Sequence, residues 1–481
     1  MGKELSHTNN WTFCEECRGE GKKKRRLSKK VRLSYQKELD DFERINAKGI
    51  RPNRPVASLY SCPSCQGTGL VKATNKLLIT NDNYPHIAIV GGGIGGVALA
   101  VACLHRGIPF TLFERDESFA VRSQGYGLTL QQASTAIKGL GIVELKGGIV
   151  STKHIVHTIE GEVIGEWGVR KWMNSVNETP SKRTNIHIAR QALRLALYEQ
   201  LGDNKNIRWG HQLIGLNKVE DNCTQLEFLV NGSKKYVKSD LVVGADGVRG
   251  SVRDLVFGTD KFPLQYLGCI VILGICSLKD IEVSDRSLLD SATVFQTVNG
   301  NERIYIMPYS ADSVMWQFSV PMPEAEAKSL HTQGPKLLKE EVCQRLKWHE
   351  PIPQILAATQ GGLVSGYPVY DRALLKAEPF GTMGAVTLLG GAAHPMSPFK
   401  GQGANQALLD ALALARGISK GCGEMSEWRE VGLRENVLAE FETEMLNRTE
   451  PKVKDSAKAA KLLHSDSVLE VRNEPRGRSL K

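Results

Sequence analysis

The stretch that decides the fold is His86–Arg115, which reads HIAIVGGGIGGVALAVACLHRGIPFTLFER. Its first five residues form a short apolar run typical of a buried strand. Residues 97–104 are apolar and alanine-rich, and Gly107 follows where a helix commonly ends. Residues 110–113 form a second apolar run that Glu114 closes. A strand, a glycine-rich turn, a helix and another strand in this order predict the start of a Rossmann-like fold.

The turn carries Gly91, Gly93 and Gly96 in the pattern G-x-G-x-x-G. Gly91 allows the tight turn, Gly93 lets the backbone approach a pyrophosphate at the positive end of the helix, and Gly96 lets helix and strand pack closely. Glu114 lies 18 residues after Gly96, close to the ~20 at which an acid accepts a hydrogen bond from a ribose hydroxyl. We therefore predict a dinucleotide site that includes Glu114 and Arg115; a glycine-rich turn without a ligand is the alternative.

Two later segments add candidate ligand-binding residues. Apolar residues at helical spacing follow Arg190, so this arginine stands at a helix start where it can meet a cofactor. The alternative is an ordinary surface arginine. Farther on, a buried strand from residue 240 ends in Asp246 and Gly247. Asp246 can accept a hydrogen bond from a sugar hydroxyl, and Gly247 permits close backbone approach.

Residues 386–405 read VTLLGGAAHPMSPFKGQGAN. They predict a strand, a Pro/Gly loop and a helix from about residue 404 to 416, stopped by Gly417. Amides at the start of that helix suit an anionic or electron-rich ring edge; they belong to Gly401, Gly403 and Ala404. His394 invites assignment as a base, but we favour a role in fixing the loop.

The pattern changes between residues 264 and 320, where four β-rich runs alternate with polar turns. They predict a second, mostly antiparallel sheet, suited to form a substrate wall. The expected fold class is α/β, with a Rossmann-like domain and an inserted antiparallel-sheet domain. The expected boundaries are a small extension at 1–80, a dinucleotide-binding domain at 85–262 and 380–418, a substrate domain at 263–379, and a long C-terminal helical segment at 419–470. Residues 465–481 are expected to be loose.

The N-terminal extension contains two C-x-x-C-x-G-x-G units, one with Cys14 and Cys17 and one with Cys62 and Cys65. Four thiolates from two such knuckles are what a tetrahedral structural zinc site needs. The glycines permit turns that aim amides at the sulfurs. The units resemble the cysteine-rich repeat of DnaJ-type chaperones. We predict zinc; a redox dithiol and two unrelated cysteine pairs are the alternatives.

The net charge of +10 lies mostly in this extension, because residues 1–84 hold 17 Lys and Arg against 9 Asp and Glu. This basic arm could bind nucleic acid or an acidic partner. We favour a solvated connector, because aromatic residues are not interleaved with the charges.

No apolar run reaches the length of about 18 residues that a membrane helix needs, so we expect no membrane insertion. Ten cysteines without a secretion signal indicate thiols in a reducing, cytoplasmic setting. The sequence leaves a monomer and a dimer open.

Taken together, the three signatures resemble the FAD-dependent class A flavoprotein monooxygenases, the para-hydroxybenzoate hydroxylase-like group, over about residues 85–460. The C-terminal loop and helix are similar to the branch that holds tetracycline-inactivating monooxygenases. The resemblance implies that Glu114 holds the adenosine ribose, that Arg190 contacts the flavin or its ribityl-pyrophosphate, and that Asp246 touches the ribityl-pyrophosphate region. It further implies that Pro398 borders the isoalloxazine ring and that backbone at Gly401, Gly403 and Ala404 faces its N1–O2 edge. Pro398 and Gly401 would thus serve catalysis by positioning alone.

By this resemblance the chain uses FAD, NAD(P)H as a transient reductant, and O2 to hydroxylate an aromatic or polyketide-like molecule through a flavin C4a-hydroperoxide. One position departs from the family, which has Asp where this chain has Gly391. Losing one hydrogen bond to a charged group costs about 1.5–3 kcal/mol, which weakens FAD binding without excluding it. The alternatives are a flavoprotein oxidoreductase without oxygen insertion and a non-catalytic binding protein built around the zinc module.

Overall fold

The computed structural model describes residues 11–44, 51–55, 57–73, 83–121, 125–134, 136–168, 185–202, 206–219, 223–376, 380–381, 384–423 and 426–477. The chain divides into two compact units. The smaller unit is Asn9–Leu77, and the larger contains Leu78–Lys481 together with Met1–Thr8. Each unit is described by itself.

The larger unit is built on a five-stranded sheet in the order β12-β6-β5-β16-β22, in which all neighbours run parallel. The strands are β5 (Ile87–Val90), β6 (Phe110–Phe113), β12 (Ile207–Arg208), β16 (Leu241–Gly244) and β22 (Val386–Leu388). Every residue of β5, β16 and β22 is buried, as expected for a parallel sheet covered on both faces. This confirms the Rossmann-like fold predicted from the glycine-rich stretch.

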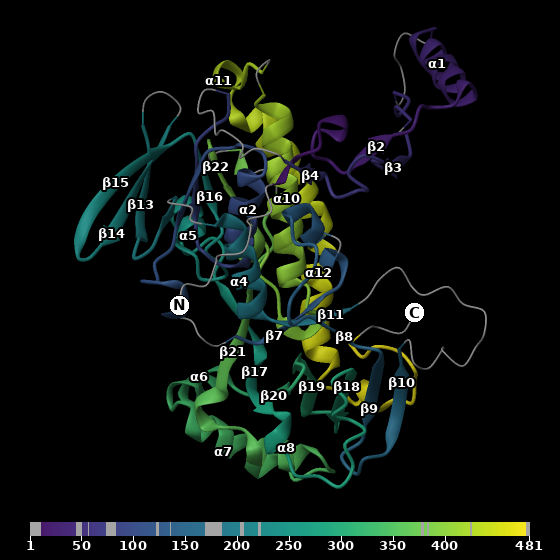
Figure 1. Ribbon diagram of the computed structural model, residues 1–481, viewed down its shortest axis with the longest axis vertical. Helices are drawn as coiled ribbons and strands as arrows, with labels where there is room; N and C mark the ends of the chain where they lie inside the picture. The colour runs from purple at the N-terminus through teal and green to yellow at the C-terminus, as the bar shows by residue number, and fades with distance from the viewer. Residues whose placement is uncertain are drawn as a thin grey trace. The chain divides into compact units, whose positions relative to one another are not determined.

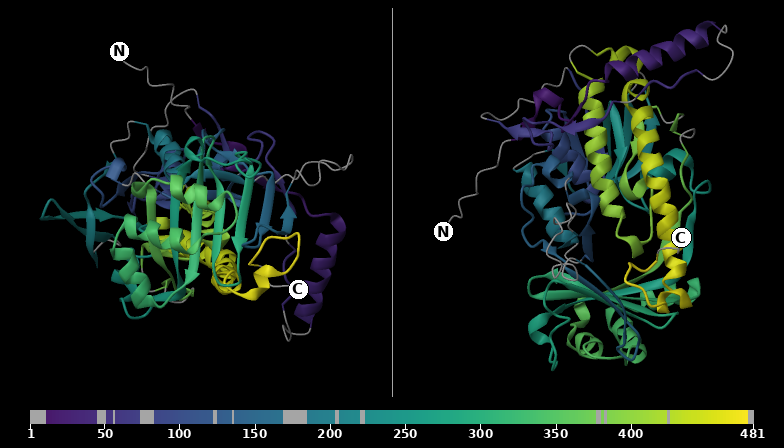
Figure 2. Two further views of the ribbon diagram at one scale, coloured as in Figure 1. Left: turned by 90° about the horizontal axis from the view of Figure 1, so that it is seen from below. Right: turned by 90° about the vertical axis from the view of Figure 1, so that its right-hand side faces the viewer.

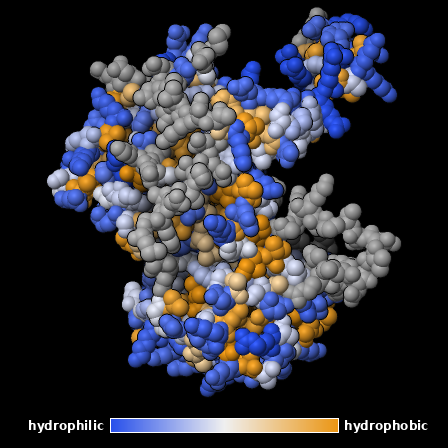
Figure 3. Space-filling model, viewed as in Figure 1, coloured by the Kyte–Doolittle hydropathy of each residue, from blue (hydrophilic) through white to orange (hydrophobic). Residues whose placement is uncertain are grey.

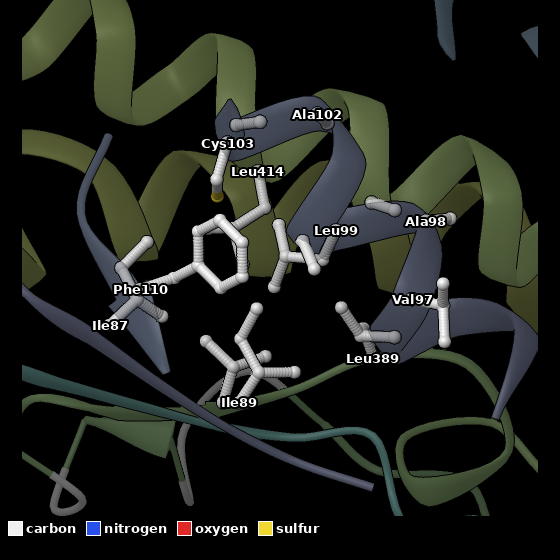
Figure 4. Packing of buried hydrophobic residues seen from close by; sticks show 14 of the residues in the cluster. Ile87, Ile89, Val97, Ala98, Leu99, Ala102, Cys103, Phe110, Leu389 and Leu414 are labelled. Carbon is white, nitrogen blue, oxygen red and sulfur yellow. The ribbon is translucent and has the colours of Figure 1, made fainter. Parts of the chain in front are cut away.

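Helices α2 (Ile94–Leu104), α4 (Arg190–Leu201) and α10 (Gly403–Gly421) pack around this sheet. Figure 4 shows the contact: Ile89 and Phe110 from the strands meet Leu99 of α2 and Leu414 of α10. All four side chains are almost completely buried. Their burial fixes the position of α2, and hence of the glycine-rich turn at its start.

A seven-stranded sheet with the order β10-β9-β18-β19-β20-β17-β21 forms the second layer. Its strands are β9 (Lys153–His157), β10 (Val163–Trp167), β17 (Leu264–Ser277), β18 (Thr293–Val298), β19 (Arg303–Ser310), β20 (Ser313–Pro321) and β21 (Val364–Arg372). All neighbours are antiparallel except β9 and β18. Helices α6 (Glu324–Thr332), α7 (Pro335–Arg345) and α8 (Ile352–Ala358) cover one face of it (Figures 1 and 2).

Two strands of this sheet, β9 and β10, precede the predicted start of the substrate domain at residue 263. They join it because β9 pairs in parallel with β18, from Lys153 opposite Thr293 to His157 opposite Thr297. A pairing between segments so far apart in the chain leaves no local pattern, so sequence inspection placed these residues in the dinucleotide-binding part.

Two three-stranded sheets complete the larger unit. One holds β7 (Gly127–Leu130), β8 (Ile149–Val150) and β11 (Ile186–Ala189), and the other is the antiparallel group β13 (Gln212–Lys218), β14 (Thr224–Val230) and β15 (Ser233–Ser239). Helix α5 (Ser251–Phe257) follows β16. Sheet β7-β11-β8 packs near β19 and thereby lies between the two main layers.

The C-terminal part runs through α10, the short helix α11 (Trp428–Val431), a π-helical turn at Arg434–Leu438 and α12 (Ala439–Leu462). Helices α10 and α12 lie side by side (Figure 2). The expectation that Gly417 ends α10 is wrong, since the helix continues to Gly421. A Cβ at residue 417 would lie 3.2 Å from Val437 Cγ1, so this glycine allows the π-helical turn to approach.

The prediction that the chain is loose from residue 465 is wrong for 465–477. A 3-10 helix spans Asp466–Leu469, and the buried guanidinium of Arg476 donates to the carbonyls of Val468 and Ile164 at 3.0 Å. An arginine that satisfies several backbone carbonyls fixes a segment that lacks regular structure.

The smaller unit has two short antiparallel pairs, β1 (Trp11–Phe13) with β4 (Leu70–Lys72) and β2 (Lys22–Lys24) with β3 (Leu59–Ser61). Helix α1 (Lys29–Arg44) contains no buried residue. In the part of the chain that the structure describes, no helix has both the length and the apolar character needed to cross a membrane.

Candidate functional site: a cavity at the ends of the parallel strands

A cavity of about 1100 Å³ opens where β5, β16 and β22 end. Residues directly after each strand line it, among them Gly91, Asp246 and Gly390. It continues past β7 and β11 to side chains of the seven-stranded sheet. In open parallel sheets, ligands bind beyond the carboxyl ends of the strands, so the cavity lies where the fold class predicts a ligand.

The three glycines of the G-x-G-x-x-G turn meet different requirements. Gly91 has φ +111°, and a Cβ there would lie 2.6 Å from the carbonyl oxygen of Ala245. A Cβ on Gly96 would overlap the carbonyl oxygen of Gly91, so no larger residue fits between helix and turn. Gly93 faces open space on the cavity wall, with nothing within 4 Å of an added Cβ. The first two glycines thus serve packing, and Gly93 leaves room for a ligand.

Glu114 is 7% exposed and braces the same turn. Its Oε2 accepts the Gly92 N–H at 2.7 Å, and its Oε1 accepts the Asp116 N–H at 3.1 Å. Each carboxylate oxygen keeps a second lone pair for a hydroxyl donor. Glu114 and Arg115 both line the cavity.

Sequence inspection missed Arg194 and Tyr198, which hold the other side of the turn. Arg194 Nε donates to the Gly92 carbonyl at 2.8 Å, and the Tyr198 hydroxyl donates to it at 3.3 Å. Both lie on α4 at positions four and eight after Arg190, and therefore on one helix face. The spacing of Arg194 and Tyr198 from Arg190 was the feature of the sequence from which their role could have been predicted.

Arg190 begins α4 and lines the cavity. Its backbone N–H donates to the carbonyl of Tyr126 at 3.1 Å, and its guanidinium carbon lies 5.9 Å from the centre of the Tyr126 ring. The structure therefore places this arginine on the cavity wall.

Asp246 and Gly247 follow β16 and also line the cavity. Asp246 Oδ2 accepts the Val252 N–H at 3.0 Å, whereas Oδ1 is buried without a partner. Burial raises the pKa of Asp246 to about 6, against the lowering effect of backbone hydrogen bonds. Gly247 has φ +84° and nothing within 4 Å of an added Cβ. A buried acceptor without a donor beside open space fits a ligand hydroxyl.

The loop between β22 and α10 contains two short 3-10 turns, Gly390–Ala392 and Pro398–Lys400. Gly401 has φ +59°, which ends the second turn and leads into α10. Asn405, which sequence analysis did not single out, holds this loop against β7. Its Oδ1 accepts the N–H groups of Gln131 and Ala133, and its Nδ2 donates to the carbonyls of Thr129 and Gly401. Gly391, Pro398, Gly401, Gly403 and Ala404 all line the cavity.

The structure supports the loop-fixing interpretation of His394. Its Nε2 lies 2.7 Å from Oδ2 of the fully buried Asp410, which also accepts the Gly390 N–H at 2.8 Å. Arg448 of α12 donates to Asp410 Oδ1 at 2.8 Å. Burial alone would raise the pKa of Asp410, but the interactions of its carboxylate with His394 and Arg448 are stronger. The pKa of Asp410 is therefore lowered. The histidine thus ties the loop to α10 and α12.

In the smaller unit, the Sγ atoms of Cys14, Cys17, Cys62 and Cys65 all lie within 4.8 Å of one another, and the four residues are buried. The N–H groups of Gly21 and Gly69 point at Cys17 Sγ and Cys65 Sγ, both at 3.2 Å. Four convergent sulfurs with amide donors fit a closed tetrahedral metal site.

A family model for FAD-binding domains matches residues 85–426. The chain therefore belongs to the FAD-binding domain family, and FAD is the cofactor that this family binds. The open space at Gly93 and Gly247 and the unpartnered Asp246 oxygen fit such a group.

Individual relatives include a monooxygenase/isomerase and an epoxidase. The aurachin C monooxygenase/isomerase of Stigmatella aurantiaca is 30% identical over 343 residues, which cover 69% of this chain and 80% of the relative. A zeaxanthin epoxidase of Solanum lycopersicum is 25% identical over 398 residues, covering 79% of this chain and 54% of the relative. The chain thus spans about half the length of that epoxidase.

Solved structures share the fold. HpxO of Klebsiella pneumoniae, complexed with FAD and uric acid, has a TM-score of 0.64 at 20% identity, covering 80% of this chain and 90% of that one. The tetracycline destructase Tet(51) has a TM-score of 0.57 at 18% identity, covering 80% and 94%. These findings confirm the predicted resemblance to the FAD-dependent monooxygenases.

Proposed function

We propose that this chain is an FAD-dependent monooxygenase that uses NAD(P)H and O2 to hydroxylate an aromatic or polyketide-like small molecule. The observation that carries the proposal is one continuous cavity of about 1100 Å³. It runs from the glycine-rich turn, past the Pro398–Ala404 loop, to the seven-stranded sheet. Cofactor and substrate can therefore meet at that loop.

In this proposal, the cavity residues near the parallel strands bind successive parts of FAD. Gly93 leaves space for the pyrophosphate while Gly91 and Gly96 shape the turn, and Glu114 accepts from the adenosine ribose with Arg115 beside it. Arg190, Asp246 and Gly247 bind the ribityl-pyrophosphate region. Pro398, Gly401, Gly403 and Ala404 border the flavin ring, with Gly391 facing Gly247.

Bound FAD supplies the redox chemistry. The chain's own residues position the reactants and exclude water. Asn405 and Asp410 hold the loop that borders the ring, through the hydrogen bonds described above. In this reaction class the protein supplies no nucleophile.

Colour and oxygen uptake test the proposal. The purified protein should show the visible absorbance of oxidised flavin, and an aromatic substrate should stimulate NAD(P)H oxidation with matching O2 uptake and one oxygen atom in the product. Stimulated oxidation without oxygen insertion would point to the oxidoreductase alternative. A protein that takes up no flavin would contradict the proposal and favour a non-catalytic role.

For the smaller unit, we propose one structural zinc ion on Cys14, Cys17, Cys62 and Cys65. The converging sulfurs and the two amide donors support it. Elemental analysis of protein purified without chelator should find about one zinc per chain. A Cys62→Ser variant should lose the metal, whereas Cys343→Ser, on α7, should retain it.

We further propose that the basic arm is a solvated connector. Helix α1 buries none of its residues, and hydrophilic side chains dominate its surface (Figure 3). Salt-sensitive binding of the full chain to a DNA or RNA oligonucleotide would contradict this. We propose a cytoplasmic location as well, supported by the ten cysteines, which form no disulfide among the residues that the structure describes.

A further inference from the structure

Helix α1 of the smaller unit has an apolar side, although none of its residues is buried within the part of the chain that the structure describes. Ser28 fixes where the helix begins, because its Oγ accepts the Val31 N–H at 3.3 Å. Residues three and four positions apart lie on the same face of a helix. On this basis four side chains form one apolar stripe along α1: Val31, Tyr35, Leu39 and Phe42.

The charges of α1 are divided between its two halves. Residues 29–37 carry four basic side chains and no acidic one, whereas residues 38–44 carry four acidic side chains and one basic one. A membrane surface or a nucleic acid would attract the first half and repel the second. A second copy of the helix, running in the opposite direction, offers each half its opposite charge.

The charges beside the apolar stripe have the positions that an antiparallel pair requires. Lys30 and Asp41 lie on one side of the stripe, and Arg32 and Glu43 lie on the other side. On both sides the basic and the acidic residue are separated by about three helical turns. When two antiparallel copies pack stripe to stripe, each side of the stripe meets the same side of the other copy in reversed order. Lys30 then lies near the partner's Asp41, and Arg32 lies near the partner's Glu43.

A parallel pair would bring opposite sides of the stripe together at the same height. Lys30 would then lie near the partner's Arg32, and Asp41 near the partner's Glu43, so that both contacts would be repulsive. Among the described residues, Lys30, Arg32 and Glu43 form no ion pair, and Asp41 pairs with Arg44 of its own helix at 3.3 Å. That pair is exposed and stabilises the helix little by itself, so these side chains are available to a second copy.

We propose that two copies of this chain associate through α1 as an antiparallel helix pair, with the apolar stripe at its centre. Val31 lies opposite the partner's Phe42, and Tyr35 lies opposite the partner's Leu39. The 16 residues of α1 span about 24 Å, and two such helices bury less than the ~1,200 Å² below which complexes are weak and transient. The dimer is therefore reversible, and the charged sides of the connector stay in water. This inference does not depend on the proposed monooxygenase function.

Sedimentation velocity of the full-length protein, purified without chelator, tests the proposal between about 1 and 200 μM, the range in which weak complexes form. The fraction of dimer should rise across this range. A protein that stays monomeric throughout would overturn the proposal. Monomeric protein that binds vesicles of phosphatidylcholine and phosphatidylserine would instead identify a membrane as the partner, and would overturn it as well.

Exchanging the charges tests the antiparallel geometry. Lys30→Glu with Arg32→Glu, and separately Asp41→Lys with Glu43→Lys, should each raise the dimer dissociation constant about tenfold or more, because like charges then face each other. Acidic residues near the start of a helix and basic residues near its end suit the helix dipole, so neither variant weakens α1 itself. Mixing the two variants should restore the dimer, since every facing pair then joins opposite charges. Variants that dimerise as the wild type does, or a mixture that stays monomeric, would overturn the proposal.

A substitution in the apolar stripe has a matched control on the same helix. Phe42→Ala should raise the dissociation constant about tenfold or more, since each copy loses a ring from the interface. Leu33 is 60% exposed and lies away from the stripe, so Leu33→Ala should leave the constant unchanged. Alanine favours helix more than either residue, and a lost dimer therefore reports a lost contact. An unchanged dimer in Phe42→Ala, or an equal loss in both variants, would overturn the proposal.

Discussion

The resemblance to the class A flavoprotein monooxygenases predicts an aspartate at position 391, where this chain has glycine, and the structure shows whether an aspartate side chain would fit there. The φ angle of Gly391 lies outside the left-handed region, and an added Cβ would meet Gly247 Cα and Val248 N, both at 3.5 Å. These are ordinary van der Waals distances. A carboxylate at residue 391 would lie on the cavity wall, near the Val248 N–H. Gly391→Asp therefore introduces an acceptor for a ribityl hydroxyl without backbone strain.

The change in the free energy of FAD binding on Gly391→Asp follows from two opposing effects. A hydrogen bond to a charged group contributes about 1.5–3 kcal/mol. Repulsion from Asp246, whose neighbour Gly247 touches the new Cβ, subtracts about 1 kcal/mol in a partly solvated site. The net gain is about 1 kcal/mol, or about fivefold in the dissociation constant for FAD.

Fluorescence titration of the apo-protein with FAD at pH 8 measures this change. Gly391→Ala tests the steric term alone and should bind FAD as the wild type does, because the Cβ contacts are not close. Gly391→Asn supplies a neutral acceptor and should gain less than Asp. Weaker or equal binding by the Asp variant, with Ala unchanged, would show that another group already satisfies the ribityl hydroxyl and would refute the reasoning.

Three further outcomes are expected. Burial raises the pKa of Asp246 to about 6, so in the apo-protein the carboxyl group ionises only near that pH. A cofactor hydroxyl that hydrogen-bonds to the carboxylate and returns this pKa to about 4 should tighten FAD binding about tenfold from pH 5 to 7. In the same titration, Asp246→Asn should abolish this pH dependence. Asp410→Asn leaves Arg448 without its buried partner and should cost about 3 kcal/mol in urea unfolding. Glu440→Gln, at an exposed position of α12, should be near neutral, and a loss below 1 kcal/mol for Asp410→Asn would contradict the proposed role of Asp410 in holding the loop. A chain of residues 85–481 should retain flavin, because the units are separate and the cavity lies in the larger one; a colourless, unfolded product would show that the units depend on each other.

The parts of the site that follow a local rule were predictable. The G-x-G-x-x-G turn was recognisable because Gly91 and Gly96 are forced by backbone clashes within a short segment, and Glu114 because it ends the next strand. The four cysteines were recognisable because each pair has the spacing of a metal knuckle. The seven-stranded sheet was predicted in its antiparallel part, where β17 to β20 follow one another in the chain.

Contacts between segments far apart in the chain could not be predicted from the sequence. Asn405 bonds to Thr129 and Gln131, more than 270 residues earlier. Arg448 reaches Asp410 across two helices. The parallel pair of β9 and β18 joins strands separated by more than 130 residues. None of these leaves a periodicity or motif, because pairing partners are chosen by the tertiary fold.

Arg303 illustrates why even a predicted strand does not reveal its chemistry. The run at 303–307 indicates a strand, but a shift of one residue in register exchanges the two faces. The observed pairing, with Arg303 opposite Ser319 and Tyr305 opposite Gln317, places the arginine over the cavity and Ile304 in the core. The opposite register would bury the guanidinium beneath α7 and α8 and expose isoleucines to the cavity. The apolar core beneath the sheet therefore decides which side chains of β19 face the cavity, and Arg303 is among them.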